Sequence, residues 1–188
     1  KDIEGFVPYD GQLDDNGEVI DNRVYNTTDF DKNIVLAKRT KLVAKTVSDY
    51  LKKHNCRMDK TIFFCVDQEH ADRMRQALVN ENADMCAIDD KYVMRITAND
   101  EAGVKQLDNF RNVEKDYPVL VTTSKLLSTG VDVQTVKYIV LDSNIRSMTE
   151  FKQIIGRGTR VREDLGKLYF TIFDFRDVTR LFHDPDFD

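Results

Sequence analysis

The chain has 188 residues, of which 41% are hydrophobic and 32% charged, a composition typical of one substantial soluble globular domain. Its formal net charge of −5 excludes attraction of nucleic acid by overall positive charge, so any anion-binding site must be local. Apolar runs such as TIFFCV are far too short to cross a bilayer and no signal segment opens the sequence, which predicts a cytoplasmic protein without a membrane partner. Because the first residue is lysine rather than methionine, we expect a piece of a longer protein.

The first predicted unit is a short N-terminal extension, residues 1–28, which is rich in turn-forming residues. Asn16-Gly17 stands between apolar residues and suits the two positive-φ positions of a hairpin turn. We therefore predict a hairpin that packs beside the main domain rather than within its sheet. The main domain is predicted to occupy residues 29–188.

Helical spacing of apolar residues predicts three helices in the main domain. The first is long and amphipathic and ends near His54. Asp67 can cap the second with its side chain. The residues predicted to be buried are Leu36, Val43, Val47, Tyr50 and Leu51 in the first helix, Ala71, Met74 and Leu78 in the second, and Val104, Leu107 and Phe110 in the third.

Short apolar runs alternate with these helices and predict five strands. The first run, TIFFCV, is uniformly apolar, as in a strand that is covered on both faces. Strands separated by helical stretches imply crossover connections and a parallel sheet, so the predicted fold is a single α/β domain. The five predicted strands are residues 61–66, 92–97, 118–123, 136–142 and 167–175.

The cysteines and histidines give no indication of a metal centre. Cys56, Cys65 and Cys86 form no C-x-x-C pair, and the three histidines are far apart in the sequence. An odd, unpaired set of cysteines fits a reducing compartment better than a disulfide scaffold. Cys65 lies within an apolar run and is predicted to be a buried core thiol.

A run of polar residues follows the strand 118–123, at the edge where parallel sheets of this kind bind ligands. Hydroxyls and one lysine can bind phosphate oxygens, and a glycine allows close approach of the backbone. An aspartate at the end of the run can accept a hydrogen bond from a sugar hydroxyl. A Ser/Thr-rich turn punctuated by glycine would have the same composition, so the segment alone leaves both interpretations open. The residues are Thr122, Thr123, Ser124, Lys125, Ser128, Thr129, Gly130 and Asp132.

The segment QIIGRGTR, residues 153–160, places two arginines three residues apart. At that spacing both guanidinium groups share one face of a helical turn, and their planar forks match phosphate oxygens. Gly156 and Gly158 remove side chains beside Arg157, so a bulky ligand could approach the backbone. A solvated basic turn is the alternative interpretation of these eight residues.

Taken in order, these segments resemble a known family. VLVTTSKLLSTGVD followed by QIIGRGTR is similar to motifs V and VI of superfamily 2 helicases and translocases, with TIFFCVD in the place of motif IV. The longer stretches RMDKTIFFCVDQEHADRMRQALVNENAD, TTSKLLSTGVDVQTVKYIVLD and MTEFKQIIGRGTR resemble the R subunit of type I restriction enzymes, a motor subunit that translocates and cuts DNA. The resemblance runs from about Asp29 to Asp188 and implies a second RecA-like domain, with a parallel sheet and flanking helices.

The resemblance also implies roles for individual residues. Arg157 and Arg160 would be arginine fingers on the γ-phosphate of ATP, and Gln153 would help to orient that end of the nucleotide. The residues implied at the nucleotide are Gly130, Asp132 and Gly156, and those implied near the DNA phosphates are Thr122, Thr123, Ser124 and Thr97. For Thr97, a purely structural hydroxyl at the end of a strand is an equal alternative.

Other parts of an ATPase are missing from the sequence. It has no G-x-x-x-x-G-K-[ST] phosphate loop, no acidic segment after a strand to hold magnesium, and no nuclease constellation with convincing spacing. We therefore expect ATP and Mg²⁺ to be bound mainly by a first RecA-like domain outside this chain, and the isolated chain to be inactive. The implied partners are double-stranded DNA, the first RecA-like and nuclease domains of the same subunit, and methyltransferase and specificity subunits.

Three alternatives stay open. The chain could be the second RecA-like domain of another repair or remodelling helicase, or a catalytically dead RecA-like domain that serves protein contacts. The intact arginines of QIIGRGTR argue against a dead domain. They could instead form a structural ion-pair network with Asp132, Asp142 and Glu163.

Overall fold

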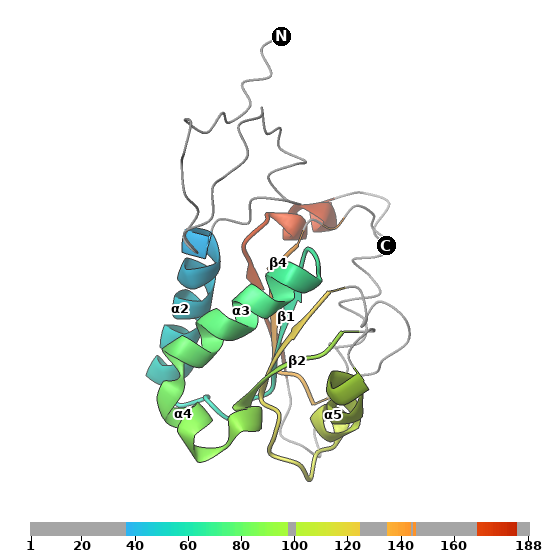
Figure 1. Ribbon diagram of the computed structural model, residues 1–188. Helices are drawn as coiled ribbons and strands as arrows, with labels where there is room; N and C mark the ends of the chain where they lie inside the picture. The colour runs from blue at the N-terminus through green and yellow to red at the C-terminus, as the bar shows by residue number, and fades with distance from the viewer. Residues whose placement is uncertain (1–36, 98–100, 125–134, 144, 146–168, 184–188) are drawn as a thin grey trace, which may run out of the picture.

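The structure is a computed structural model that describes residues 37–97, 101–124, 135–143, 145 and 169–183 (Figure 1). The predicted extension 1–28, its hairpin and the domain boundary at residue 29 lie outside the described residues, so they stay predictions.

The described residues form a parallel sheet of five strands in the order β2-β3-β1-β4-β5. Each neighbouring pair of strands runs parallel. This arrangement confirms the predicted α/β fold and its parallel sheet. The strands are β1 (Thr61–Cys65), β2 (Val93–Arg95), β3 (Leu120–Thr123), β4 (Tyr138–Asp142) and β5 (Thr171–Asp174).

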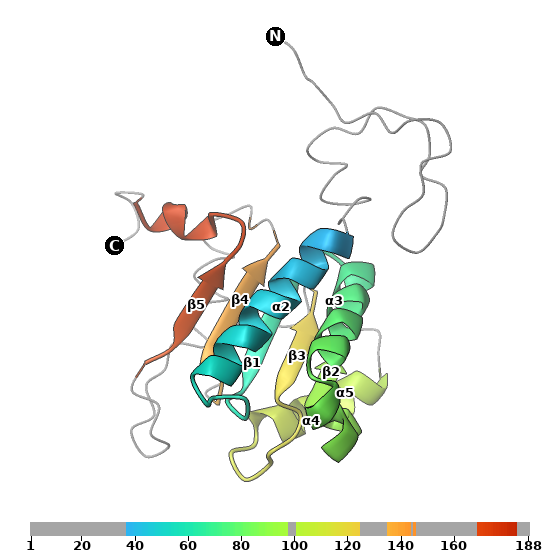
Figure 2. The ribbon, with the colours of Figure 1, turned by 90° about the vertical axis from the view of Figure 1, so that its left-hand side faces the viewer.

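Helices cover both faces of the sheet, with α2 (Ala37–Lys53) and α3 (Gln68–Glu81) on one face and α5 (Glu101–Arg111) on the other (Figures 1 and 2). These are the three helices that the sequence predicts. The described residues also contain three short helical segments: α4 (Ala83–Ile88) and the 3₁₀ turns η1 (Asp90–Tyr92) and η4 (Val178–His183). None of the residues of α4 is buried, so no apolar stripe marks it in the sequence.

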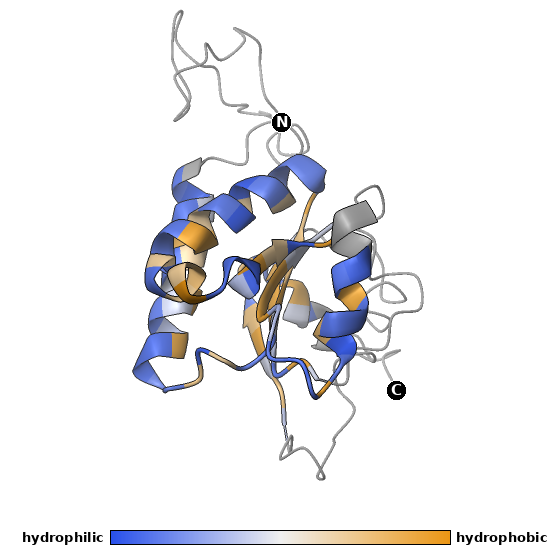
Figure 3. Cartoon of the chain, turned by 60° about the horizontal axis from the view of Figure 1, so that its bottom comes forward, coloured by the Kyte–Doolittle hydropathy of each residue, from blue (hydrophilic) through white to orange (hydrophobic). Residues whose placement is uncertain are grey.

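The hydrophobic core consists of one cluster on each face of the sheet (Figure 3). Successive side chains of a strand point to opposite faces, so Phe63 joins the cluster under α2 and α3, whereas Phe64 joins the cluster that includes Phe110 of α5. All five residues of β1 are buried, as its uniformly apolar sequence predicts. Cys65 is 4% exposed, which confirms the predicted core thiol, and burial raises the pKa of this thiol well above its usual value.

Two helix ends flank β1: the end of α2 precedes this strand and the start of α3 follows it. Asp67 caps α3 as predicted, because its carboxylate accepts a hydrogen bond of 2.7 Å from the backbone N–H of His70. Asn55 takes a left-handed conformation with φ of 54° just beyond α2, and the Cys56 N–H donates to the carbonyl of Leu51. The chain therefore turns sharply from α2 into β1.

Candidate functional site

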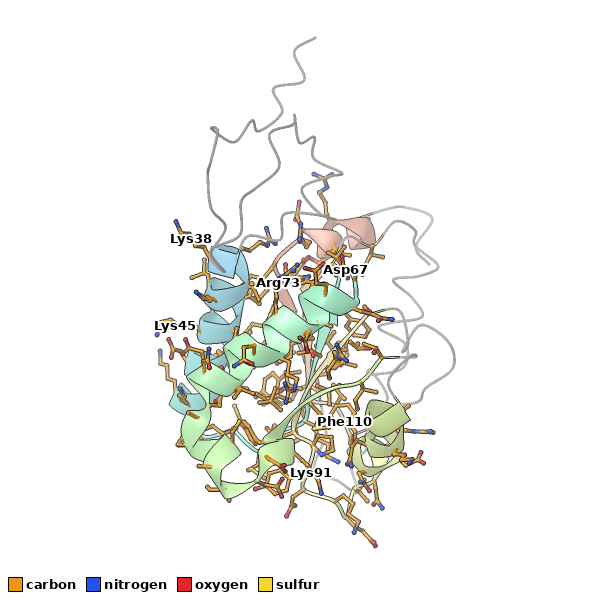
Figure 4. All side chains as sticks on the ribbon, viewed as in Figure 1. Lys38, Lys45, Asp67, Arg73, Lys91 and Phe110 are labelled. Atoms are coloured by element: carbon orange, nitrogen blue, oxygen red, sulfur yellow. The ribbon has the colours of Figure 1, made fainter. Side chains whose placement is uncertain are left out.

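The carboxyl ends of the five parallel strands lie at one edge of the sheet. In the register of the sheet, Cys65 at the end of β1 is opposite Asp142 at the end of β4, and Phe64 is opposite Thr123 of β3. The first turn of α2 and the start of α3 reach the same edge, and Figure 4 shows Lys38 and Asp67 toward that end of the molecule. This carboxyl edge is where sheets of this type bind ligands.

A buried charge cluster occupies the carboxyl edge. Asp142 is completely buried, and its Oδ1 accepts hydrogen bonds from Arg39 Nε at 3.2 Å, Arg39 Nη2 at 2.9 Å and Arg176 Nε at 3.1 Å. His70, which is also completely buried, places Nε2 at 3.4 Å from Asp142 Oδ2. Four segments that are distant in the sequence therefore meet at one carboxylate, which we call the Asp142 cluster (Arg39, His70, Asp142 and Arg176).

The hydrogen bonds of His70 define its tautomer. The backbone N–H of Val66 donates to His70 Nδ1 over 3.2 Å, so this nitrogen must be unprotonated and the proton of a neutral ring lies on Nε2. The Nε2–H group faces Asp142 Oδ2, but the separation of 3.4 Å is long for a hydrogen bond. Within the described part of the chain, neither His70 Nε2 nor Asp142 Oδ2 has a hydrogen-bond partner. The guanidinium groups are therefore the principal counter-charges of Asp142.

Asp142 is ionised in the folded protein. Burial by itself raises the pKa of a carboxyl group, but the neighbouring His70 ring and the cations Arg39 and Arg176 outweigh burial, and the pKa of Asp142 lies below its ordinary value. Removal of either the carboxylate or the arginines would leave an uncompensated buried charge, which destabilises the folded state.

Two further acidic residues at this edge, Asp67 and Asp174, accept hydrogen bonds from backbone N–H groups. Asp67 accepts from His70 N, and Asp174 accepts from Arg176 N at 3.0 Å and from Thr179 N at 2.6 Å. Backbone donors accordingly outweigh the burial of Asp174 and lower its pKa. The guanidinium groups of Arg39 and Arg176 at this edge are donors that suit an anion such as phosphate.

The four residues predicted near the DNA phosphates all lie at the carboxyl edge, and all are buried. Thr122 and Thr123 are 0% exposed, Thr97 is 1% exposed and Ser124 is 7% exposed. The Thr122 hydroxyl donates to the carbonyl of Ala71 over 2.8 Å, so it holds β3 against α3. The Thr123 hydroxyl has no hydrogen-bond partner among the residues that the structure describes. These positions could therefore contact a phosphate only through their backbone N–H groups, or through side chains that become exposed when a complex forms.

The remaining predicted site residues lie outside the described residues; they are Gly130, Asp132, Gln153, Gly156, Arg157 and Arg160. Conversely, sequence reasoning did not single out Arg39, His70 or Arg176. The available signal was weak: an acidic residue that ends a uniformly apolar strand, as Asp142 does, must find cations somewhere in the fold.

Metal-binding clusters and membrane spans are both absent from the described residues. Across the described residues, no three His, Cys, Asp or Glu side chains come together in a way that could hold a metal ion. The described helices also include none with the length and apolar content needed to span a bilayer.

Comparison with known families defines the class of protein. Residues 37–162, more than half of the chain, match the family model of the helicase conserved C-terminal domain. The matched region includes the strands β1 to β4 and, in the sequence, both TGVD and QIIGRGTR. The chain therefore belongs to the helicase C-terminal domain family, and its fold is the RecA-like lobe of such helicases.

Within this family the chain is homologous to subunits of type I restriction enzymes. It is 59% identical over 187 residues to the EcoAI endonuclease subunit of Escherichia coli, and 28% identical over 176 residues to the EcoKI endonuclease subunit of strain K12. These alignments cover 100% and 86% of the chain, but only 23% and 14% of the two relatives. A solved fragment assigned to the HsdR subunit of a type I restriction enzyme from Vibrio vulnificus YJ016 is 50% identical. It superposes with a TM-score of 0.78 over 86% of this chain and 32% of that one.

Proposed function

We propose that the chain is the second motor lobe of an ATP-dependent DNA translocase, in the R subunit of a type I restriction–modification enzyme. The 59% identity to the EcoAI endonuclease subunit over the whole chain is the observation that carries this proposal. Another repair or remodelling helicase, the main alternative, is disfavoured by the same identity. Because such a motor acts on DNA inside the cell, the proposal keeps the expected cytoplasmic location.

In this proposal, the lobe completes an ATP site whose other half is on a preceding RecA-like domain. ATP supplies the phosphoryl group that is transferred to water, and Mg²⁺ would be held mainly by the preceding domain. Arg157 and Arg160 would stabilise the negative charge that develops on the phosphoryl group, and Gln153 would orient it. Gly130, Asp132 and Gly156 would lie at the nucleotide.

The carboxyl edge would also meet the DNA backbone. Ser124 is the most exposed of the four predicted contact positions, and the hydroxyl of the adjacent Thr123 has no hydrogen-bond partner among the described residues. Thr122 would contribute indirectly, because its hydroxyl fixes β3 to α3. Thr97 would be a further contact at the end of β2. The remaining implied partners are the nuclease domain of the same subunit and the methyltransferase and specificity subunits.

The complete subunit, assembled with its partners, tests this proposal. We expect ATP hydrolysis that duplex DNA stimulates, together with translocation measured by displacement of a third strand from the duplex. The 188-residue chain alone should show neither activity, since it lacks a phosphate loop. Robust DNA-stimulated hydrolysis by this chain alone would contradict the half-site arrangement, and a complete subunit that hydrolyses no ATP would contradict the function.

A further inference from the structure

Arg39 is held rigidly at the carboxyl edge by the Asp142 cluster. It lies in the first turn of α2, 103 residues from Asp142 in the sequence, and donates two hydrogen bonds to the buried carboxylate. Its Nη2 also donates to the carbonyl of Phe175 at 2.8 Å, just beyond β5. Three hydrogen bonds therefore fix the plane of this guanidinium group.

The same guanidinium group keeps one open side. The side chain of Arg39 is 37% exposed, whereas that of Arg176 is 12% exposed and that of Asp142 is 0% exposed. Among the described residues, no hydrogen-bond partner contacts Arg39 Nη1. Lys38, the neighbouring residue, is exposed at the same end of α2 (Figure 4).

A guanidinium group in this state is well suited to an anion. Its orientation is already set, so little side-chain entropy is lost when a ligand binds. Its free N–H groups can donate charge-assisted hydrogen bonds to an oxyanion, which are stronger than bonds between neutral groups. Asp142 cannot oppose such a ligand strongly, because its carboxylate is surrounded by cations and shielded from solvent.

We propose that Arg39 contacts a phosphate group through Nη1, and that Asp142 is the positioning residue that holds Arg39 for this contact. This inference rests on the proposed function, which provides two sources of phosphate at the carboxyl edge: the nucleotide and the DNA backbone. Their shared chemistry is a phosphate oxyanion that accepts hydrogen bonds from one fixed guanidinium group. Arg39 is separate from QIIGRGTR and comes from the opposite end of the domain sequence.

The test compares variants of the complete subunit. Arg39→Gln removes the positive charge, and Asp142→Asn removes the carboxylate that holds the guanidinium group. Arg39→Lys keeps the charge but lacks the planar, two-point donor geometry of arginine. Arg57→Gln is the matched control, because Arg57 makes a comparable two-point ion pair with Asp84, at 2.6 and 2.7 Å, on the opposite, amino-terminal side of the sheet. For each variant we would measure the KM and kcat for ATP, the Kd for duplex DNA over a range of salt concentrations, and the melting temperature.

The results separate the two phosphate sources. If the nucleotide is the source, Arg39→Gln raises the KM for ATP about tenfold, in line with the loss of a charge-assisted hydrogen bond, and leaves DNA affinity unchanged. If DNA is the source, Arg39→Gln weakens DNA binding and lowers the slope of log K against log salt by about 1, with the KM for ATP unchanged. Asp142→Asn should shift the same quantity in the same direction, whereas Arg57→Gln should shift neither.

Two results would overturn the inference. The first is an Arg39→Gln subunit that keeps the wild-type KM, Kd and salt slope, whether or not its melting temperature falls; Arg39 would then only anchor α2. The second result applies if Arg39→Gln does not fold. It is an Arg39→Lys subunit whose KM for ATP, Kd for DNA and salt slope all equal the wild-type values. An inactive wild-type subunit would contradict the proposed function instead, and nucleotide and DNA binding by the variants would still test the role of Arg39.

Discussion

At the scale of single residues, Asp142 has the most informative surroundings. The sequence suggested Asp142 as one partner in an ion-pair network with Arg157 and Arg160. In the structure its Oδ1 already accepts three hydrogen bonds from Arg39 and Arg176, and its Oδ2 faces His70. The described counter-charges of Asp142 are therefore Arg39 and Arg176, and the ion-pair alternative for Arg157 and Arg160 stays open because both lie outside the described residues.

Replacing Asp142 with asparagine should remove a pH-dependent part of the stability. The pKa of Asp142 is lower in the folded protein than its ordinary value of about 3.9, so the carboxylate stabilises the fold above that pH. Its contribution is lost as pH falls below about 4 through the folded pKa. At pH 7 we expect Asp142→Asn to cost about 3 kcal/mol, since it leaves two arginines without their counter-charge.

Thermal melting of wild-type and Asp142→Asn protein between pH 7 and pH 3 measures this effect. The difference in melting temperature should be large at pH 7 and should shrink as pH falls below about 4. Asp49→Asn, which removes an exposed ion pair with Lys45, is the control and should change the melting temperature little at either pH. An equal difference for Asp142→Asn at both pH values would show that packing, not charge, is responsible.

At the scale of the elements, the predictions were most accurate where burial is complete. β1, β3 and β4 fill the centre of the sheet, and their apolar runs identified them without ambiguity. Within the described residues all five strands are shorter than predicted, and β2 and β5 are the edge strands, each paired on one side only. Tyr92, for example, belongs to η1, where its side chain is buried and its hydroxyl donates to the carbonyl of Arg57.

Lys60 joins two elements that no sequence pattern connects. Its ammonium group donates to the carbonyls of Asn109, Phe110 and Asn112, at 3.2, 2.8 and 2.8 Å, and so ties the end of α5 to the start of β1. Carbonyl groups at the end of a helix lack partners within the helix, and a cation is favourable there. Burial lowers the pKa of Lys60 to about 8, so the desolvated charge offsets part of this gain.

Lys60→Met should therefore destabilise the protein by about 1–2 kcal/mol, because it keeps most of the side-chain volume but removes three hydrogen bonds of a charged donor, although each carbonyl keeps one other donor. The midpoint of denaturant unfolding provides the measurement, and hydrogen exchange in α5 shows whether the loss is local. Lys41→Met, at an exposed position of α2, is the control and should leave the midpoint nearly unchanged. A Lys60→Met protein with the wild-type midpoint would show that the charge adds nothing to the fold.

At the scale of the whole molecule, the fold and the location of the site were predictable, but the charge cluster was not. The alternation of strands and helices predicts a parallel sheet, and a parallel sheet places its binding edge at the strand ends. Arg39 and Asp142 are 103 residues apart, and no periodicity relates them. They meet only because β4 pairs with β1 and α2 packs over both, which is tertiary information.

The chain also spans only 23% of the length of its EcoAI relative, and the proposed function assigns the rest of the ATP site to a preceding domain. A lobe without a phosphate loop can act on ATP only by adding groups to a site that another domain provides. This arrangement fits the proposed arginine fingers, which stabilise a transition state without binding the ground state tightly.

The most direct test of this role is the steady-state rate of DNA-stimulated ATP hydrolysis by complete subunits that carry Arg157→Ala or Arg160→Ala. The melting temperature is to be measured on the same preparations. We expect turnover to fall by about three to five orders of magnitude at an unchanged melting temperature, since fixed cations act mainly in the transition state. Lysine at either position should restore little activity, because an ammonium group lacks the bidentate fork. A variant that melts many degrees lower yet hydrolyses ATP at nearly the wild-type rate would contradict the proposed role of these arginines.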